Sequence, residues 1–225
     1  LAIDATVLSR AGASASLDIG GGLTVDGQLT VRGEAVNRSA ILDLNGTQTV
    51  DGSGTILLSQ DGGTAQLRLD NLLFNEREVA TLGAGVTLQG AGTVYTERGE
   101  DRFRILGSVI GDNGTLTIRN VDNEGAALSV DTSADGAVRF ETRLENAALA
   151  IAAGAAVQLG GTLAAVTVGG PGTARVASAT ASSLTVAGSA VIEGATANAS
   201  ARIDVAGGLT VDGVLSVSGT SQRTA

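Results

Sequence analysis

The chain has 225 residues, of which 33 are Gly, and it carries a formal net charge of −9 with no His, Cys, Met or Trp. Without His and Cys it lacks the usual ligands of zinc, haem and iron–sulfur sites and the parts of a Ser-His-Asp or Cys-His relay. All 14 basic residues are Arg, which excludes a Schiff-base lysine and a Walker A loop, and the acidic balance argues against binding to nucleic acid. With 43% hydrophobic residues and no apolar run of about 18, we expect a folded chain that is not inserted in a membrane.

A three-residue word, apolar-x-apolar, recurs along the chain. Its clearest copies are at 17–19, 116–118, 128–130, 157–159, 184–186 and 203–205. Alternation with a period of two predicts strands, and the Gly, Asn-Gly and Asp-Gly steps between the words predict turns. The sequence therefore predicts an all-β chain of short strands.

Two longer motifs recur at spacings that suggest a common step. Gly21–Val31 returns as Gly207–Val217 with nine of eleven residues identical, at an offset of 209 − 23 = 186. The motif apolar-x-Gly-x-Gly-Thr occurs at 50–55, 88–93 and 168–173, at offsets of 38 and 80. Both spacings fit a unit of about 19–20 residues, which predicts a β-solenoid of about 11 coils.

An antiparallel sandwich of hairpins is the alternative fold, because Asp-Gly and Asn-Gly steps also make hairpin turns. Three-residue strands are short for a sandwich, whereas in a solenoid each strand pairs with its equivalents in the coils above and below. Each word would then send its two apolar residues inward. On this basis Leu23→Asp or Leu116→Asp should destabilise the fold, and Thr117, between two apolar residues, should tolerate Arg.

The whole chain, 1–225, is predicted to be one solenoid domain. Residues 147–201 are rich in Ala and Gly and should form coils with a thinner core, while the charged segments 75–78 and 97–104 should protrude as loops. In the second loop Arg98, Arg102, Phe103 and Arg104 are candidate residues for binding an acidic or carboxylate-bearing partner. The alternating charges of this loop favour the other interpretation, in which its charges pair with one another.

Acidic residues that lie 19 positions apart are the candidates for chemistry. Asp51 with Asp70, and Asp112 with Asp131, would lie about 5 Å apart on neighbouring coils, where one pKa would rise or calcium would bind. Asp also caps backbone N–H groups in turns, which is the favoured interpretation. No catalytic residue, metal site or cofactor is therefore assigned, and the chain is expected not to be an enzyme. Asn residues at 71, 75, 113, 120, 123 and 146 are either amide ladders at coil corners or simple turn residues.

The segments 86–94, 107–118 and 128–130 resemble passenger repeats of bacterial autotransporters and filamentous-haemagglutinin-like secreted adhesins. The resemblance implies a right-handed parallel β-helix, export across the outer membrane and a role as a surface-displayed adhesin or stalk. The chain departs from the family in showing no haemagglutination-type cap, translocator barrel or protease module.

The expected function is thus that of a non-enzymatic rigid stalk and loop-presenting scaffold, extracellular or on a bacterial cell surface. Flanking segments of a longer polypeptide, or neighbouring subunits, should cover the solenoid ends, and a host or cell-surface receptor is a possible ligand of the loops. One alternative is a self-assembling subunit of a surface layer, filament or phage-like appendage. Another is a β-helix enzyme that cleaves polysaccharides.

Overall fold

The computed structural model describes residues 4–70, 76–193 and 201–218, and all regular structure in these ranges is β-strand. The strands are β1 (Ala5–Ser9), β2 (Ala15–Gly20), β3 (Leu23–Thr24), β4 (Gln28–Gly33), β5 (Ser39–Asn45), β6 (Gln48–Asp51), β7 (Thr55–Gln60), β8 (Thr64–Asp70), β9 (Val79–Leu82), β10 (Thr87–Thr96), β11 (Arg102–Ile105), β12 (Ser108–Asp122), β13 (Ala127–Thr132), β14 (Gly136–Ile151), β15 (Ala156–Gly169), β16 (Thr173–Val186), β17 (Ser189–Ile192), β18 (Arg202–Val211) and β19 (Val214–Val217). No helix in these ranges is long and apolar enough to cross a membrane.

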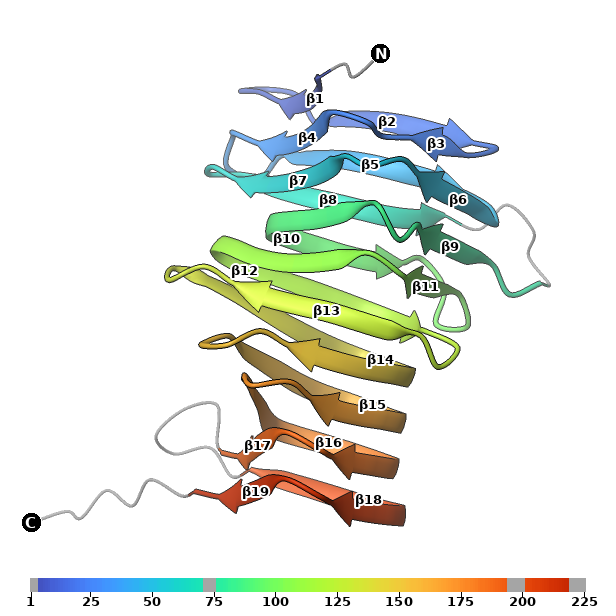
Figure 1. Cartoon of the computed structure of the whole chain (residues 1–225). Coiled ribbons are helices and arrows are strands. Elements are labelled where there is room, and N and C mark those ends of the chain that lie inside the picture. The colour runs from blue at the N-terminus through green and yellow to red at the C-terminus, as the bar shows by residue number, and fades with distance from the viewer. Residues whose placement is uncertain (1–3, 71–75, 194–200, 219–225) are drawn as a thin grey trace, which may run out of the picture.

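All pairs between these strands are parallel, and they join into a single 19-stranded sheet. Each strand pairs with strands one winding away along the chain, so that β1 lies beside β4, β4 beside β7 and β7 beside β10. Figure 1 shows the windings stacked from β1–β3 at one end to β18 and β19 at the other. The all-β class and the parallel pairing are confirmed, and the antiparallel sandwich is wrong; the winding is that of a β-solenoid.

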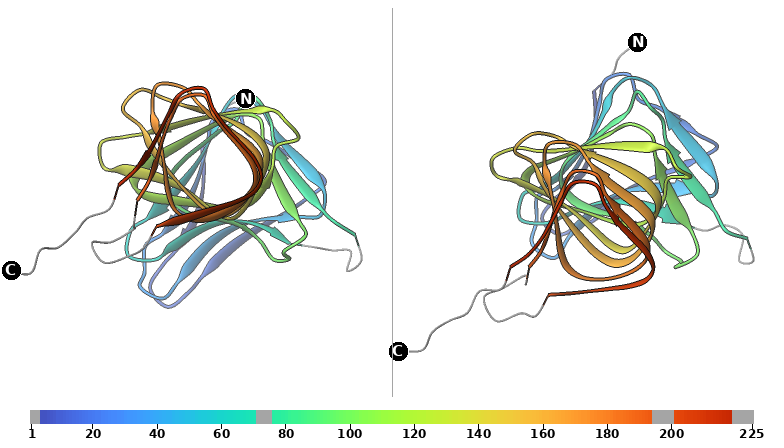
Figure 2. Two further views of the ribbon diagram at one scale, coloured as in Figure 1. Left: turned by 90° about the horizontal axis from the view of Figure 1, so that it is seen from below. Right: turned by 60° about the horizontal axis from the view of Figure 1, so that its bottom comes forward.

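Figure 2 shows the stacked coils end-on. Their interior is filled by columns of buried aliphatic side chains that run along the stack. One column passes through ten windings, from Leu17 to Val217. Its members, each paired with the next, are Leu17, Leu42, Leu67, Val94, Ile118, Phe140, Leu159, Val176, Ile192 and Val217. The eight inner members are buried, with exposed fractions of 0 to 7%. Removal of this surface from water is the main stabilising contribution to the fold.

The alternation of the sequence places side chains as expected. In β12 Leu116 and Ile118 are fully buried, while Thr117 between them faces outward and is half-buried. Leu23, by contrast, is only partly buried, because β3 pairs with β6 alone. The expected turns are also present: Gly52, after Asp51, has φ of 112°, and a Cβ at that position would lie 2.1 Å from the carbonyl oxygen of Val25.

The expected step of about 19–20 residues is wrong for most of the chain. In one ladder the positions that lie side by side are 5, 29, 56, 88, 109, 130 and 151, so that successive numbers differ by 24, 27, 32, 21, 21 and 21. Further along the chain, positions 149, 168, 186 and 211 are neighbours and differ by 19, 18 and 25. Coils of the expected length thus fall in the Ala- and Gly-rich part of the chain, where Ala residues such as Ala174 and Ala190 fill the core.

The near-identical segments Gly21–Val31 and Gly207–Val217 do not occupy equivalent places. Leu29 belongs to the ladder that contains Val109, whereas Leu215, its counterpart in the second copy, belongs to the ladder that contains Leu116. The offset between the two segments is therefore not a whole number of coils. The motif consists of a strand, an Asp-Gly turn and a second strand, and it forms two different corners of the solenoid. The spacing between its copies therefore does not give the coil length.

Candidate functional site: a charged patch on the outer side of β11, β12 and β14

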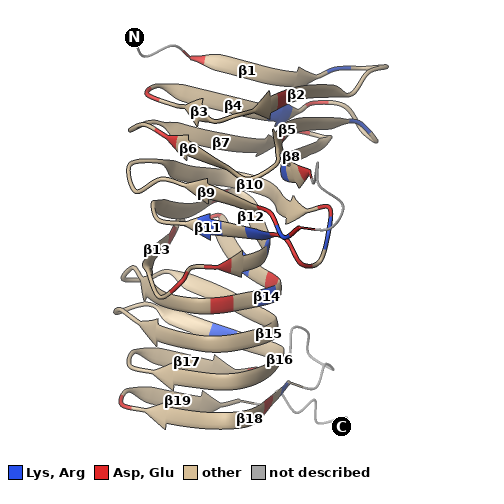
Figure 3. Ribbon diagram, turned by 90° about the vertical axis from the view of Figure 1, so that its right-hand side faces the viewer, with Lys and Arg blue, Asp and Glu red and all other residues tan. Residues whose placement is uncertain are grey.

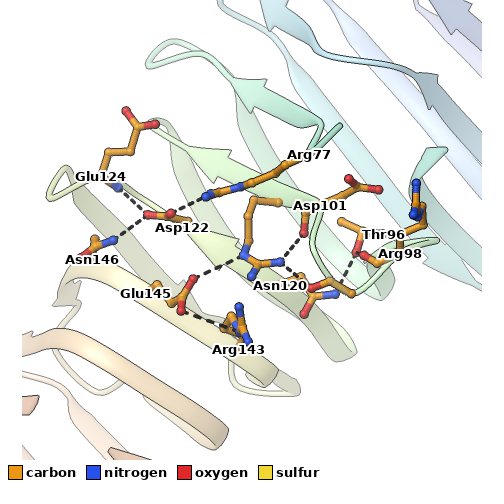
Figure 4. A network of polar contacts seen from close by, with 12 residues as sticks. Arg77, Thr96, Arg98, Asp101, Asn120, Asp122, Glu124, Arg143, Glu145 and Asn146 are labelled. Atoms are coloured by element: carbon orange, nitrogen blue, oxygen red, sulfur yellow. Dashed lines mark hydrogen bonds and ion pairs between the residues drawn. The ribbon is translucent and has the colours of Figure 1, made fainter. Parts of the chain in front are cut away.

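Charged residues gather around residues 97–101, β11 and the neighbouring parts of β12 and β14 (Figure 3). Figure 4 shows how their side chains contact one another. The sequence of β11, Arg-Phe-Arg-Ile, alternates so that Phe103 and Ile105 face the core and the two Arg residues face outward. Phe103 is fully buried and pairs with Ala80 on one side and Val121 on the other. The predicted loop 97–104 is therefore wrong at its C-terminal end, because strand pairing begins at Arg102.

Arg102 is covered by the loop that precedes it and is only 3% exposed. Its Nη1 donates to the carbonyl oxygens of Gly99 at 2.6 Å and Asp101 at 2.8 Å, and its Nε donates to Glu145 at 3.4 Å. Burial, reinforced by the nearby Arg143 guanidinium, lowers the pKa of Arg102 from its ordinary value. Arg102 thus fastens the loop to the solenoid and is not available to a partner at the surface.

The loop is also tied to the segment that leads into β9. Asp101 is fully buried, and its Oδ1 accepts the backbone N–H of Glu78 at 2.9 Å. In the same segment Arg77 reaches Asp122 on β12, with 2.7 Å between Nη2 and Oδ2. Of the expected loop 75–78, Asn75 lies outside the described residues and Glu78 is buried, so only Glu76 and Arg77 face the surface.

Asp122 is the acidic centre of the patch. Its Oδ1 accepts from the side-chain amide of Asn146 at 3.0 Å and from the backbone N–H of Glu124 at 3.2 Å. Burial alone would raise its pKa, but the hydrogen bonds from Asn146 and Arg77 outweigh burial and hold the pKa of Asp122 below its usual value. Asp122 therefore stays ionised and links three separate segments of the chain.

Buried amides add bonds between neighbouring coils. The side chain of Asn123 accepts from the N–H of Ile105 at 2.7 Å and donates to its carbonyl oxygen at 2.8 Å. Asn120 donates to Thr96 at 2.8 Å, and Thr96 in turn donates to the carbonyl oxygen of Arg98 at 2.6 Å. Each of these amides bonds to a different kind of group, so they do not form an amide ladder. Asn71 and Asn75 lie outside the described residues.

The remaining two predicted partner residues are at the surface and are engaged in ion pairs. Arg98 pairs with Glu100 at 2.9 Å, and Arg104 pairs with Glu124 at 2.9 Å, with about a third of each Arg side chain exposed. The four residues predicted for one binding loop thus have three different environments. Arg102 is buried and bonded to the loop, Phe103 lies in the core, and Arg98 and Arg104 form ion pairs at the surface. Partner binding by Arg98 and Arg104 stays a prediction.

The acidic pairs proposed as neighbours are not neighbours. Asp70 pairs with Asn45 and Asp51 pairs with Thr24, while Asp131 pairs with Ile110. The expectation placed residues 19 positions apart on neighbouring coils, whereas the local coils are longer, with 130 − 109 = 21 and 56 − 29 = 27. In the described ranges no three His, Cys, Asp or Glu side chains lie close enough to hold a metal ion.

Asp112 is held by a different set of groups. It accepts hydrogen bonds from Ser133, on the next coil, and from Gln89, on the previous coil, at 3.2 Å for the latter. These bonds lower the pKa of Asp112 from its ordinary value. Asp112 lies within β12, not in a turn, and its carboxylate links β12 to the coils on both sides.

Several members of the charged patch were not found from the sequence. Arg77 and Asp122 are far apart in the chain, and Glu145, which pairs with Arg102, lies beside Asp122 on the next coil, at 145 − 122 = 23. A fixed coil length as short as the one expected could not bring these residues together. One feature of the sequence could have predicted part of the patch. The alternation in Arg-Phe-Arg-Ile indicates a strand with Arg102 and Arg104 on the same side.

The patch consists of ion pairs and hydrogen bonds that hold the loop 97–101 against three windings.

Comparison of the chain with protein-family models, curated proteins and solved structures found no match.

Proposed function

We propose that this chain is a non-enzymatic structural segment of a bacterial β-solenoid adhesin or passenger, secreted or displayed at the cell surface. Its role is that of a stiff spacer that carries loops on its sides. The proposal joins the parallel winding to the resemblance of the 86–94, 107–118 and 128–130 segments to passenger repeats.

The observation that carries this proposal is the ten-membered column from Leu17 to Val217. Because its eight inner members are buried and successive members are paired, no winding can tilt or slide without exposing apolar side chains. A continuous packed column resists bending in a way that domains joined by linkers do not. This property suits a spacer.

The charged patch supports the second part of the role. The loop 97–101 is held by Arg102 from beneath and by the contact of Asp101 with Glu78, so that Arg98 and Glu100 are presented on a fixed base. A loop that is ordered before binding loses less conformational entropy when a partner binds. We propose that such loops are where a receptor binds.

The handedness and the number of coils are finer points of the same proposal. We expect right-handed coils, because connections between parallel strands of one sheet are right-handed in nearly all proteins. We expect fewer than the eleven coils inferred from the sequence, because the coils that connect positions 5, 29, 56 and 88 each use more of the chain than the sequence suggested.

A distance measurement between the two ends tests the spacer role. Ser16 and Ser216 face outward and terminate one row of ten side-by-side residues, and the chain has no Cys to interfere with labelling. Spin labels at Ser16→Cys and Ser216→Cys should give one narrow distance distribution, centred near the roughly 43 Å of nine steps of about 4.8 Å. A broad distance distribution for the folded chain in buffer without denaturant would contradict a rigid spacer.

A further inference from the structure

A hollow of about 320 Å³ opens on the outer side of three neighbouring strands in the middle of the described stack. The residues that line it include Arg139, Glu141 and Thr142 of β14, Gln158 and Gly160 of β15, and Ser178 of β16. Leu159 contributes only its backbone, because its side chain is buried in the core. The hollow is therefore a polar concavity on the side of the solenoid.

Gly160 adds no side chain to the hollow, although the strand does not require glycine there. Its φ is not positive, and a Cβ at this position would meet the carbonyl oxygens of Ser178 at 3.6 Å and Phe140 at 3.7 Å, which are ordinary contacts. Gly161 differs, since its φ is 73° and a Cβ there would lie 2.5 Å from the carbonyl oxygen of Thr142. Position 160 could therefore hold a side chain, and its absence leaves room for a ligand.

Positive charge exceeds negative charge beside the hollow. Glu141 pairs with Arg119 at 3.1 Å and with Arg139 at 3.0 Å, so that two guanidinium groups share one carboxylate. Both Arg side chains are 45% exposed. Because the whole chain carries a net charge of −9, this local excess of positive charge makes the hollow a more favourable place for an anion than most of the surface.

The hollow also carries backbone strain and exposed hydrogen-bonding groups. Thr142 has φ of 66°, which is costly for a β-branched residue, and strain of this kind concentrates at ligand-binding sites. The side chains of Thr142, Gln158 and Ser178 are exposed and bring two hydroxyl groups and one amide to the hollow. Such groups both donate and accept hydrogen bonds.

We propose that this hollow binds an acidic sugar, that is, a ring with several hydroxyl groups and one carboxylate. The planar guanidinium of Arg139 matches the geometry of a carboxylate, and the side chains of Thr142, Gln158 and Ser178 suit the ring hydroxyls. Protein partners bind chiefly through aromatic and large apolar side chains, which the lining of the hollow does not supply, so a sugar fits better than an acidic peptide. The proposal goes beyond the spacer role and does not depend on it.

NMR titration of the isotope-labelled chain with glucuronate tests the site. Backbone amide signals of residues 139–142, 158–161 and 178 should shift in a saturable way. They should shift much less with glucose, which has no carboxylate, and with acetate, which has no ring. Equal affinity for acetate and glucuronate would contradict the proposal. Saturable shifts with a peptide of Glu and Gly, but none with glucuronate, would overturn it in favour of a protein partner.

Arg139→Gln should weaken the binding of glucuronate by at least about tenfold, because it removes a charge-assisted hydrogen bond. The matched control is Arg175→Gln. Arg175 is also an outward neighbour of Gln158, is 49% exposed and pairs with Glu193, yet it does not line this hollow. It should keep the affinity of the unaltered chain. An equal loss in both variants would mean that general charge attracts the ligand, and the assignment of the hollow would fail.

Gly160→Val should abolish binding and leave thermal unfolding unchanged, because the new side chain would occupy the hollow and valine suits a strand. Gly169→Val is the matched control, since Gly169 also lies in β15 and a Cβ there would meet the carbonyl oxygen of Leu149 at an ordinary 3.4 Å, outside the hollow. Undiminished binding by a folded Gly160→Val chain would contradict the proposal. If this variant does not fold, the Arg139 and Arg175 variants still decide the question, and the end-to-end distance tests the spacer role separately.

Discussion

Residues with left-handed backbone conformation mark the corners of the coils. Thr142 has φ of 66° and Gly161, its neighbour on the next coil, has φ of 73°. A Cβ on Gly161 would lie 2.5 Å from the carbonyl oxygen of Thr142. Glycine takes this conformation without strain, but a β-branched residue is strongly disfavoured there. Thr142 is therefore a locally strained residue in an otherwise regular strand.

Replacement of Thr142 by Gly should stabilise the protein by about 1 kcal/mol, since the strain removed exceeds the entropy that glycine costs in the unfolded state. Urea unfolding at neutral pH measures the change. Thr93→Gly is the matched control, because Thr93 lies in β10 outside the positive-φ positions and should lose about 0.5–1 kcal/mol. Equal destabilisation by both substitutions would mean that Thr142 is not strained.

The lowered pKa of Asp122 links the charged patch to stability in acid. Because the folded-state pKa lies below the unfolded value of about 3.9, this carboxylate stabilises the fold at pH values above about 4. The contribution is lost as pH falls through the folded-state pKa. Asp122→Asn should therefore be less stable than the unaltered chain at pH 7 and should change less in stability between pH 5 and pH 3.

Arg77→Gln is the companion variant, since it removes one of the groups that stabilise the ionised form. NMR titration should show the pKa of Asp122 moving up toward its usual value. If the pKa stays where it is in the unaltered chain, the ion pair seen at 2.7 Å does not contribute to it in solution.

At the scale of the strand, alternation decides which side chain is essential. Leu116→Asp should cost several kcal/mol because a carboxylate would be buried with no partner, whereas Thr117→Asp, at the next position, should change stability by no more than about 0.5 kcal/mol. Thermal unfolding of the two variants measures the contrast. Leu23→Asp should cost less than Leu116→Asp, because Leu23 is only partly buried. Similar losses at 116 and 117 would contradict the inward and outward assignment.

Strands and their faces could be predicted from the sequence because they depend on local alternation. The words at 116–118 and 157–159 lie in β12 and β15 with their apolar residues buried, as expected. The same rule applied to Arg-Phe-Arg-Ile would have moved Phe103 into the core, but the surrounding charges favoured a loop. Local charge density was thus weaker evidence than alternation.

At the scale of the whole molecule, coil length could not be predicted, because it depends on how much of the chain each corner takes. The step is 88 − 56 = 32 where the segment from β8 to β9 is included, and 186 − 168 = 18 in the Ala-rich coils. Contacts between coils follow from these steps, so the Arg77–Asp122 pair and the separation of Asp51 from Asp70 could not be predicted either. The spacing of the two near-identical segments gave a wrong coil length for a related reason. They share a strand–turn–strand structure but lie at different corners of the coil, so their spacing is not a multiple of the coil length.

The parallel stacking of successive coils is the claim on which the whole account depends. Thr117, Arg139 and Gln158 are outward neighbours on three successive coils. Neighbouring Cα atoms about 4.8 Å apart fall within the range of a disulfide, whereas two steps of about 9.6 Å do not.

Paired Cys substitutions test this stacking directly, because the chain has no Cys of its own. Under mild oxidation at a concentration low enough to prevent intermolecular bonds, Thr117→Cys with Arg139→Cys, and Arg139→Cys with Gln158→Cys, should form disulfides within the chain. Thr117→Cys with Gln158→Cys should not. Efficient linkage of 117 to 158, or failure of both neighbouring pairs to link, would contradict the β-solenoid.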